Sequence, residues 1–270
     1  MGLYDVIDDI ANKQILKTET GDNRIFGVVI GLVVSNYDKD HPGKICVSIP
    51  MRDKDANELK WAKMVQMSSG KNWGTYFLPE VGDQVMLVFD HGIIDKPYVI
   101  GCVPKDNDSF FTKAADDKNR IKRITTKNGS TIEFTDNDKG DGEKDAIAIK
   151  TATNAYEFHM DNEKKEVYLS DKDKENQIVM NTESGKMTVK AKKNLTVEVG
   201  DNISLIMNGE TGKVTLKTKK LLVEASEGAD IKSDRNVNVA GAKVKIEGNS
   251  STEVSSSGST KIAGNMISMG

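Results

Sequence analysis

A short strand pattern that returns about every eight residues constrains what the last hundred residues of this chain can fold into. Each repeat places apolar side chains among Thr, Lys, Ser, Glu and Asn, usually as a pair two positions apart. Neighbouring side chains of a strand point to opposite faces, so each repeat has one apolar face and one polar face. The interval is too short for a strand followed by a helix and too regular for loops. The C-terminal part is therefore predicted to be a stack of strands.

Such a stack must bury its apolar face. One solenoid coil normally needs more than eight residues to turn its corners and enclose a core. Three copies wound together solve the problem, because each copy supplies one side of a triangular prism and the apolar faces meet on the axis. The repeat therefore predicts an obligate homotrimer. Its predicted core residues are Val197, Leu205, Val214, Val223, Ile231, Val239, Ile246, Val254 and Ile262.

The strand repeat is longer and bulkier upstream, where apolar pairs between residues 147 and 189 lie nine to eleven residues apart. The last Trp of the chain is Trp73, the last Phe is Phe158 and the last Tyr is Tyr168. Because no aromatic ring follows Tyr168, the prism is expected to narrow towards the C-terminus. Its beginning carries Lys127-Asn128-Gly129-Ser130, and Asn-Gly is a strong hairpin signal. Residues 136–145 are too charged for a core and are predicted to form a turn.

The N-terminal part has a different texture. Five strand patterns lie at residues 26–34, 44–50, 60–65, 84–89 and 98–103, which is the number of strands in a small closed barrel of the OB type. The predicted fold class is all-β: an N-terminal OB-fold barrel followed by a trimeric intertwined β-helix that forms a triangular β-prism needle. The predicted domains are a docking segment (1–24), the OB-fold domain (25–104), a polar connector (105–122) and the β-helical spike (123–270).

Composition and isolated motifs exclude several function classes. With a net charge of −3, the chain lacks the excess of basic residues that is usual in a protein that binds nucleic acid. Cys46 and Cys102 lie in apolar strand patterns, where free buried thiols are expected. The three histidines His41, His91 and His159 have no second ligand nearby in sequence, so no catalytic residue, metal or cofactor is predicted.

Three weaker motifs have ordinary structural interpretations. The acidic run 136–143 departs from the spacing of a calcium loop, and the stretch 209–213 is too short for a phosphate loop. Both are predicted to be turns. Aromatic residues of the barrel could stack on bases, but acids balance the nearby lysines, and packing in the core or between subunits is favoured. These aromatic residues are Trp61, Trp73, Tyr76 and Phe77.

The first residues carry Asp5, Asp8 and Asp9 where a secretory signal would be basic and then apolar. We therefore expect synthesis in the bacterial cytoplasm without a signal peptide. Apolar residues between positions 3 and 17 have a loosely helical spacing, which predicts a short amphipathic segment. Two interpretations of this segment stay open: it docks on a partner, or it is a frayed terminus.

Residues 78–103 closely resemble the P-x-V-G-D-x-V-x-V-x-F-x-x-G-x-x-D-x-P-x-V-x-G-x-V block of the VgrG and phage baseplate assembly protein V families. Upstream, residues 31–33, 43–50 and 61–63 are similar to the same families. The matching motif residues are Pro79, Val81, Gly82, Asp83, Phe89, Gly92, Asp95, Pro97 and Gly101. Proline and glycine at these spacings shape turns, so these residues are expected to form the fold rather than to catalyse a reaction.

The resemblance implies a non-enzymatic, trimeric central spike of a contractile injection machine. Its barrels would form a collar under the tube, and its needle would pierce the target cell envelope, with transient contact with the target membrane. The particle could be a phage tail, a phage-tail-like bacteriocin or a secretion device, released or extracellular in use. Only about 24 residues precede the barrel, so the hub is expected to be a separate baseplate protein at the N-terminal end.

The C-terminal tip departs from short spikes that end in a His-x-His iron site. It is apolar, with Met266, Ile267 and Met269, and is expected to bind a small PAAR-like cap protein. Two other function classes stay open. One is a trimeric receptor- or carbohydrate-binding tail fibre, and the other is a single-chain β-helix enzyme acting on polysaccharide, which would need longer coils and clustered carboxylates.

Overall fold

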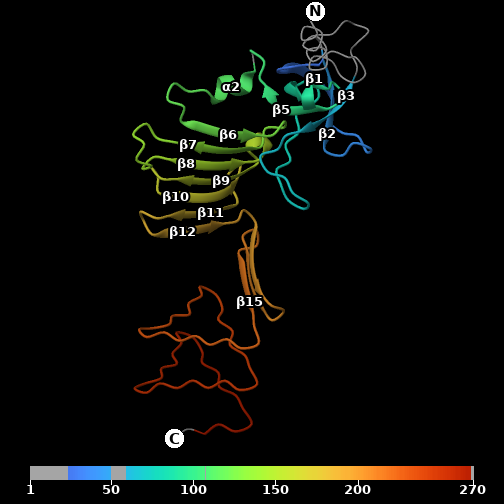
Figure 1. Cartoon of the computed structure of the whole chain (residues 1–270). Helices are drawn as coiled ribbons and strands as arrows, with labels where there is room; N and C mark the ends of the chain where they lie inside the picture. Colours follow the sequence, from blue (N-terminus) through green and yellow to red (C-terminus); the bar gives the residue numbers. More distant parts are fainter. Residues whose placement is uncertain (1–23, 50–58, 107, 269–270) are drawn as a thin grey trace, which may run out of the picture. The chain divides into compact units, whose positions relative to one another are not determined.

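The computed structural model describes residues 24–49, 59–106 and 108–268 of the chain. They belong to two compact units that divide between Lys192 and Lys193, and each unit is described by itself. The first holds a closed barrel and a seven-stranded sheet, and the second holds a three-stranded sheet (Figure 1). Apart from Arg24, the predicted docking segment lies outside the described residues.

The barrel is built from five strands in the order β1-β2-β3-β5-β4. Every neighbouring pair is antiparallel except β3 and β5, which are parallel. The predicted five-stranded barrel is therefore confirmed. Its strands are β1 (Val29–Ser35), β2 (Lys44–Ser48), β3 (Lys60–Met64), β4 (Gln84–Phe89) and β5 (Pro97–Val103). The largest fully buried side chains are Val33, Ile45, Val47, Val85, Leu87 and Val99.

Two details of the N-terminal part differ from the sequence predictions. The first strand begins at Val29 rather than at residue 26, because Gly27 has a φ of 98°, outside the range of a strand. The polar connector also contains a one-and-a-half-turn helix, α2 (Ser109–Ala114), which the charge pattern did not indicate. Within it, the rings of Phe110 and Phe111 meet edge to face, with their centroids 5.1 Å apart.

The seven-stranded sheet is an antiparallel meander in which each strand pairs with the next one along the chain (Figure 1). Its polar turns include the charged stretch 136–145, as predicted. The strands are β6 (Ile121–Thr125), β7 (Thr131–Thr135), β8 (Ala146–Lys150), β9 (Tyr156–Asp161), β10 (Glu166–Asp171), β11 (Gln177–Asn181) and β12 (Lys186–Lys190).

The hairpin predicted around Asn128-Gly129 is confirmed between β6 and β7, but its turn is not the two-residue type that Asn-Gly favours. The N–H of Thr126 donates to the carbonyl of Ser130 at 2.9 Å, which leaves three residues in the loop. Gly129 has a φ of 98°, whereas Asn128 does not take the positive φ that a type I′ turn requires.

The second unit begins with another antiparallel meander, formed by β13 (Asn194–Val199), β14 (Ile203–Asn208) and β15 (Lys213–Lys217). The stretch 209–213, weighed above as a phosphate loop, connects β14 to β15 and is a turn, as predicted. From residue 218 to residue 268 the single chain forms no strand, although the apolar repeat continues there. Over the described ranges, no helix has the length and apolar character needed to cross a membrane.

Candidate assembly surfaces

The first turn of the sequence motif ties β1 to β4 of the barrel. The N–H of Gly82 donates to the carbonyl of Val33 at 2.9 Å, and the N–H of Val33 donates to the carbonyl of Asp83 at 3.0 Å. The Asp83 carboxylate accepts the N–H of Glu80 at 2.9 Å, and Gly82 supplies a φ of 93°. Pro79 is buried, whereas Val81 is exposed.

The second turn of the motif connects β4 to β5. Gly92 lies at a φ of 75°, and its carbonyl accepts the N–H of Ile25 at 2.9 Å. Asp95 pairs with the ammonium group of Lys60 at 2.5 Å. The remaining motif residues lie in or beside the strands: Phe89 and Pro97 are buried, and Gly101 pairs with Met86 next to a β-bulge. All nine motif residues thus build the barrel.

One face of the seven-stranded sheet carries two continuous apolar rows. Cross-strand partners bring one residue from each strand into register, and neighbours in a row are close enough to pack. The first row is Ile124, Ile132, Ile149, Phe158, Leu169, Ile178 and Val189. Beside it, the second row is Phe134, Ile147, Met160, Val167, Met180 and Met187. Most members of the first row and half of the second are exposed in the single chain.

The three-stranded sheet of the second unit has the same design. Val197, Leu205 and Leu216 are cross-strand partners, and Leu195, Met207 and Val214 form a second row beside them. Three predicted core residues, Val197, Leu205 and Val214, therefore share one face of one sheet. Large exposed apolar patches mark interaction surfaces, so this face is a candidate for one.

The other six predicted core residues lie in the strandless stretch 218–268. Every large apolar side chain that is assigned as exposed there keeps between 52% and 88% of its surface accessible. Of the predicted tip residues, Met266 and Ile267 are exposed, and Met269 lies outside the described residues. The six core residues are Val223, Ile231, Val239, Ile246, Val254 and Ile262.

The opposite face of the seven-stranded sheet is polar. His159 stacks on Tyr168 with ring centroids 5.1 Å apart, and its Nδ1 lies 3.1 Å from a carboxylate oxygen of Glu157. Burial raises the pKa of Tyr168 to about 12, and the negative charge of Glu157 adds to the shift. Burial alone would raise the pKa of Glu157, but the hydrogen bond and charge of Lys150 outweigh it and lower this pKa. In this cluster, Glu157 pairs with both Lys150 and His159 on the surface of the sheet.

A similar turn recurs in the sheets of both units, and the sequence interpretation missed it. Three turns share the pattern Met-Asp/Asn-x-Glu-x-Lys/Gly, beginning at Met160, Met180 and Met207. In each turn the Asp or Asn side chain accepts the N–H three residues later, at 2.8–2.9 Å. The sixth residue is left-handed in all three: Lys165, Gly185 and Gly212. The recurrence of this pattern in the sequence would have been enough to predict the three turns.

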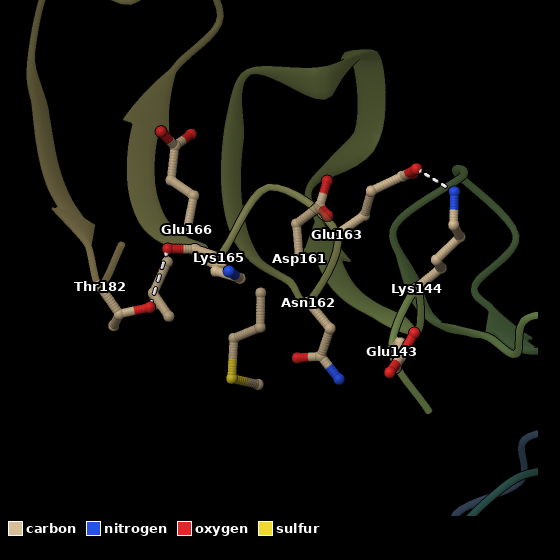
Figure 2. Close-up of a pocket in the computed structure, with 10 residues that line it drawn as sticks. Glu143, Lys144, Asp161, Asn162, Glu163, Lys165, Glu166 and Thr182 are labelled. Atoms are coloured by element: carbon tan, nitrogen blue, oxygen red, sulfur yellow. Dashed lines mark hydrogen bonds and ion pairs between the residues drawn. The ribbon is translucent and has the colours of Figure 1, made fainter. Parts of the chain in front are cut away.

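Each turn is joined to an earlier connection of the same unit by a backbone hydrogen bond and an ion pair. The third residue of each turn donates its N–H to a carbonyl in the preceding connection at 2.7–3.0 Å. Its glutamate pairs with a lysine there, giving Lys144–Glu163, Lys165–Glu183 and Lys193–Glu210. Figure 2 shows the first of these pairs, and it shows the Thr182 hydroxyl donating to the Lys165 carbonyl beside a hollow of about 720 Å³. We call these three turns the turn ladder.

Histidines and acidic groups do not gather into a metal centre in the described parts of the chain. His41 stacks on Trp61 with centroids 4.7 Å apart, and His91 lies exposed in the turn before β5. In the acidic turn 136–145, Asn137 and Asp141 use their side-chain oxygens to accept backbone N–H groups of the same turn. Cys46 is buried as predicted, but Cys102 is exposed.

Comparison with known protein families places the barrel. Residues 29–103 match the sequence profile of the family described as the type VI secretion system/phage-baseplate injector OB domain. This range begins and ends with the barrel strands β1 and β5. A search of curated proteins found no match.

Proposed function

We propose, from the match of residues 29–103 to the type VI secretion system/phage-baseplate injector OB domain, that the chain is a structural component of a contractile injection machine. From that premise we propose that it is the trimeric central spike of a phage tail or tail-like particle. The barrels sit under the tube beside a separate hub protein, and the C-terminal needle pierces the target envelope when the sheath contracts.

One observation carries this proposal: the apolar repeat runs on to residue 262, yet the single chain makes no strand in the described stretch from residue 218 to residue 268. A strand pattern without strand partners lacks partners for its backbone N–H and C=O groups, and burying such groups unpaired costs free energy. Two further copies would supply both the backbone partners and the cover for the apolar faces. The same cover suits the open rows on β6–β12 and β13–β15.

The proposed role is mechanical. Each buried Val, Ile or Leu of the needle contributes about 1.5–3 kcal/mol when three apolar faces meet on the axis. Strands from three chains would have to separate together for the needle to unfold, so resistance to unfolding is expected to be kinetic. Such a needle can transmit force from the sheath to a membrane without a chemical step.

The solution mass of the purified full-length chain tests the proposal. Multi-angle light scattering should give three times the chain mass of 29.6 kDa. A mass of 29.6 kDa would mean that the strands find their partners within one chain, and the spike proposal would be abandoned for a single-chain carbohydrate-binding or enzymatic function.

The tip has a separate role in the proposal, as the seat of a PAAR-like cap protein. Met266, Ile267 and Met269 of three copies would form a flat apolar platform. Deleting residues 264–270 is expected to abolish binding of a cap protein encoded beside this chain while the mass stays trimeric. Binding that survives the deletion would move the cap site elsewhere.

A further inference from the structure

Residues 66–77, between β3 and β4, form an ordered hairpin that we call the aromatic hairpin. Ser69 and Gly74 form an antiparallel bridge, and the N–H of Gly70 donates to the carbonyl of Trp73 at 2.8 Å. The N–H of Thr75 donates to the carbonyl of Ser68 at 3.0 Å, and the Thr75 hydroxyl donates to Gln66 at 3.3 Å. The segment thus has a fixed conformation before any partner arrives.

This hairpin exposes large apolar side chains that a monomer would ordinarily bury. Met67, Trp73 and Tyr76 keep 96%, 68% and 71% of their surfaces accessible, and Phe77 is also exposed. Its only charged residue is Lys71. Tryptophan, tyrosine and methionine on a rigid support are typical of the centre of a protein interface. One lysine is too little charge for a nucleic-acid groove.

An apolar pocket of about 450 Å³ adjoins the base of the hairpin. Phe77 lines it together with members of the first apolar row, including Ile132, Ile149, Phe158 and Leu169. Its volume is that of a site for a small organic group. The chain does not fill this pocket with its own Trp73 or Tyr76, because both remain exposed to solvent.

We propose that the aromatic hairpin of each copy seats Trp73 and Tyr76 in the apolar pocket of a neighbouring copy of the same chain. The inference rests on the proposed trimer, and it names the contact that locks the trimer at its barrel end. Each copy gives one hairpin and receives one, so the contact is head to tail and closes after three copies. The hairpin surface is continuous with the apolar row through Phe77, so both surfaces become covered in the same step.

The two tryptophans of the chain allow a direct test. Trp61→Phe keeps a ring against His41 and leaves Trp73 as the only indole. In this variant at trimer concentration, Trp73 emission should be blue-shifted and poorly quenched by acrylamide, whereas denaturation should return the emission of an exposed indole. A trimeric mass with a readily quenched Trp73 would overturn the hairpin inference and leave the spike proposal standing. A monomeric mass would overturn both.

A photo-cross-linking amino acid at position 73 tests the receiving site. Irradiation should give covalent dimers and trimers on a denaturing gel, with position 73 joined to the tryptic peptides that carry Ile149 or Phe158. Position 37 is the matched control, because Tyr37 is 79% exposed on the same barrel and should give no such bands. Cross-links confined to one chain, or cross-links to a hub protein alone, would contradict the proposed occupant.

Discussion

At the scale of single residues, Gly92 shows how the motif works. Its φ of 75° strains any L side chain, and an added Cβ would lie 3.0 Å from the Cβ of Arg24 and 3.2 Å from backbone atoms of Ile25. Gly43 has a similar φ of 74° but no atom within 4 Å of an added Cβ. Substitutions at the two glycines therefore distinguish the cost of backbone strain, which both would carry, from the cost of a close contact, which only Gly92 would carry.

Gly92→Ala is therefore expected to lower the free energy of unfolding of the barrel by about 1–3 kcal/mol, through strain at a positive φ together with the close contact. Gly43→Ala should cost less, because it carries the strain alone. Urea denaturation followed by tryptophan emission measures both, since Trp61 and Trp73 lie in the barrel part of the chain. Equal costs for the two variants would show that the Arg24 contact relaxes freely.

Tyr168 gives the polar face a dependence on alkaline pH. Its pKa rises in the folded state from 10.0 to about 12, so the folded chain holds the phenol proton more tightly than the unfolded chain. The corresponding stability is fully present below pH 10 and is lost as the pH rises towards 12. Tyr168→Phe should flatten the fall of the thermal midpoint over this range, whereas Tyr37→Phe should leave it unchanged. A slope that Tyr168→Phe does not alter would contradict the assignment.

The sequence allowed the motif residues to be predicted one by one, because proline and glycine spacings report turns directly. It did not indicate the stack of His159 on Tyr168, because the two residues become cross-strand partners only once the register of β9 and β10 is known. The exposure of Cys102 was missed for a related reason. An apolar strand pattern does not say which of its two faces lies inside the barrel.

At the scale of elements, the turn ladder combines two devices of unequal strength. In the second turn, the Asn181 side chain accepts both the N–H and the hydroxyl of Ser184 at 2.8 Å. The ion pair of Glu183 with Lys165, at 3.2 Å, joins two exposed side chains. A hydrogen bond that shapes a turn contributes about 1 kcal/mol, whereas exposed ion pairs contribute about 0–1 kcal/mol and are screened by salt.

Asn181→Ala is thus expected to destabilise the sheet by about 1 kcal/mol at any ionic strength. Glu183→Ala should cost less, and raising the salt concentration should remove its effect. Denaturation midpoints in low and high salt distinguish the two variants. A larger, salt-sensitive cost for Glu183→Ala would mean that the ion pairs act as a cooperative network.

Elements were easier to predict than their connections. Period-two patterns located ten strands after the connector, but the strands that they predicted between residues 221 and 262 do not form in the single chain, and the helix α2 and the three-residue loop at Gly129 were not expected. Six residues carry too little periodicity to indicate a helix, and Asn-Gly is compatible with more than one turn.

At the scale of the whole molecule, the repeat predicts that a face must be buried, but a single chain does not contain its cover. Val239 is 72% exposed in the described structure, and its neighbours in the repeat, Ile231 and Ile246, are also exposed. Only an assembly can decide whether this position lies on an axis. A pair of adjacent substitutions addresses that question.

Val239→Asp would place three carboxylates around the proposed axis, at about 3–5 kcal/mol per chain for an uncompensated buried charge. We expect the heat-resistant trimer to be lost. Asn238→Asp adds the same charge one residue earlier. It would lie on the opposite face of the strand that the trimer is proposed to form, and it should leave the trimer intact. Light scattering after heating measures both. A trimer that survives Val239→Asp would show that this side chain does not face the axis.

The strandless stretch from residue 218 to residue 268 also affects how long an unassembled chain would survive in the cell. In the proposed trimer every edge is closed, whereas a lone chain or a pair leaves backbone open to any peptidase. Unassembled copies would then be shortened and cleared, and finished needles would persist. Limited proteolysis of a diluted, refolding sample should trim the chain from residue 218 onward until the third copy binds. Protease resistance would then report that an assembly holds all three copies.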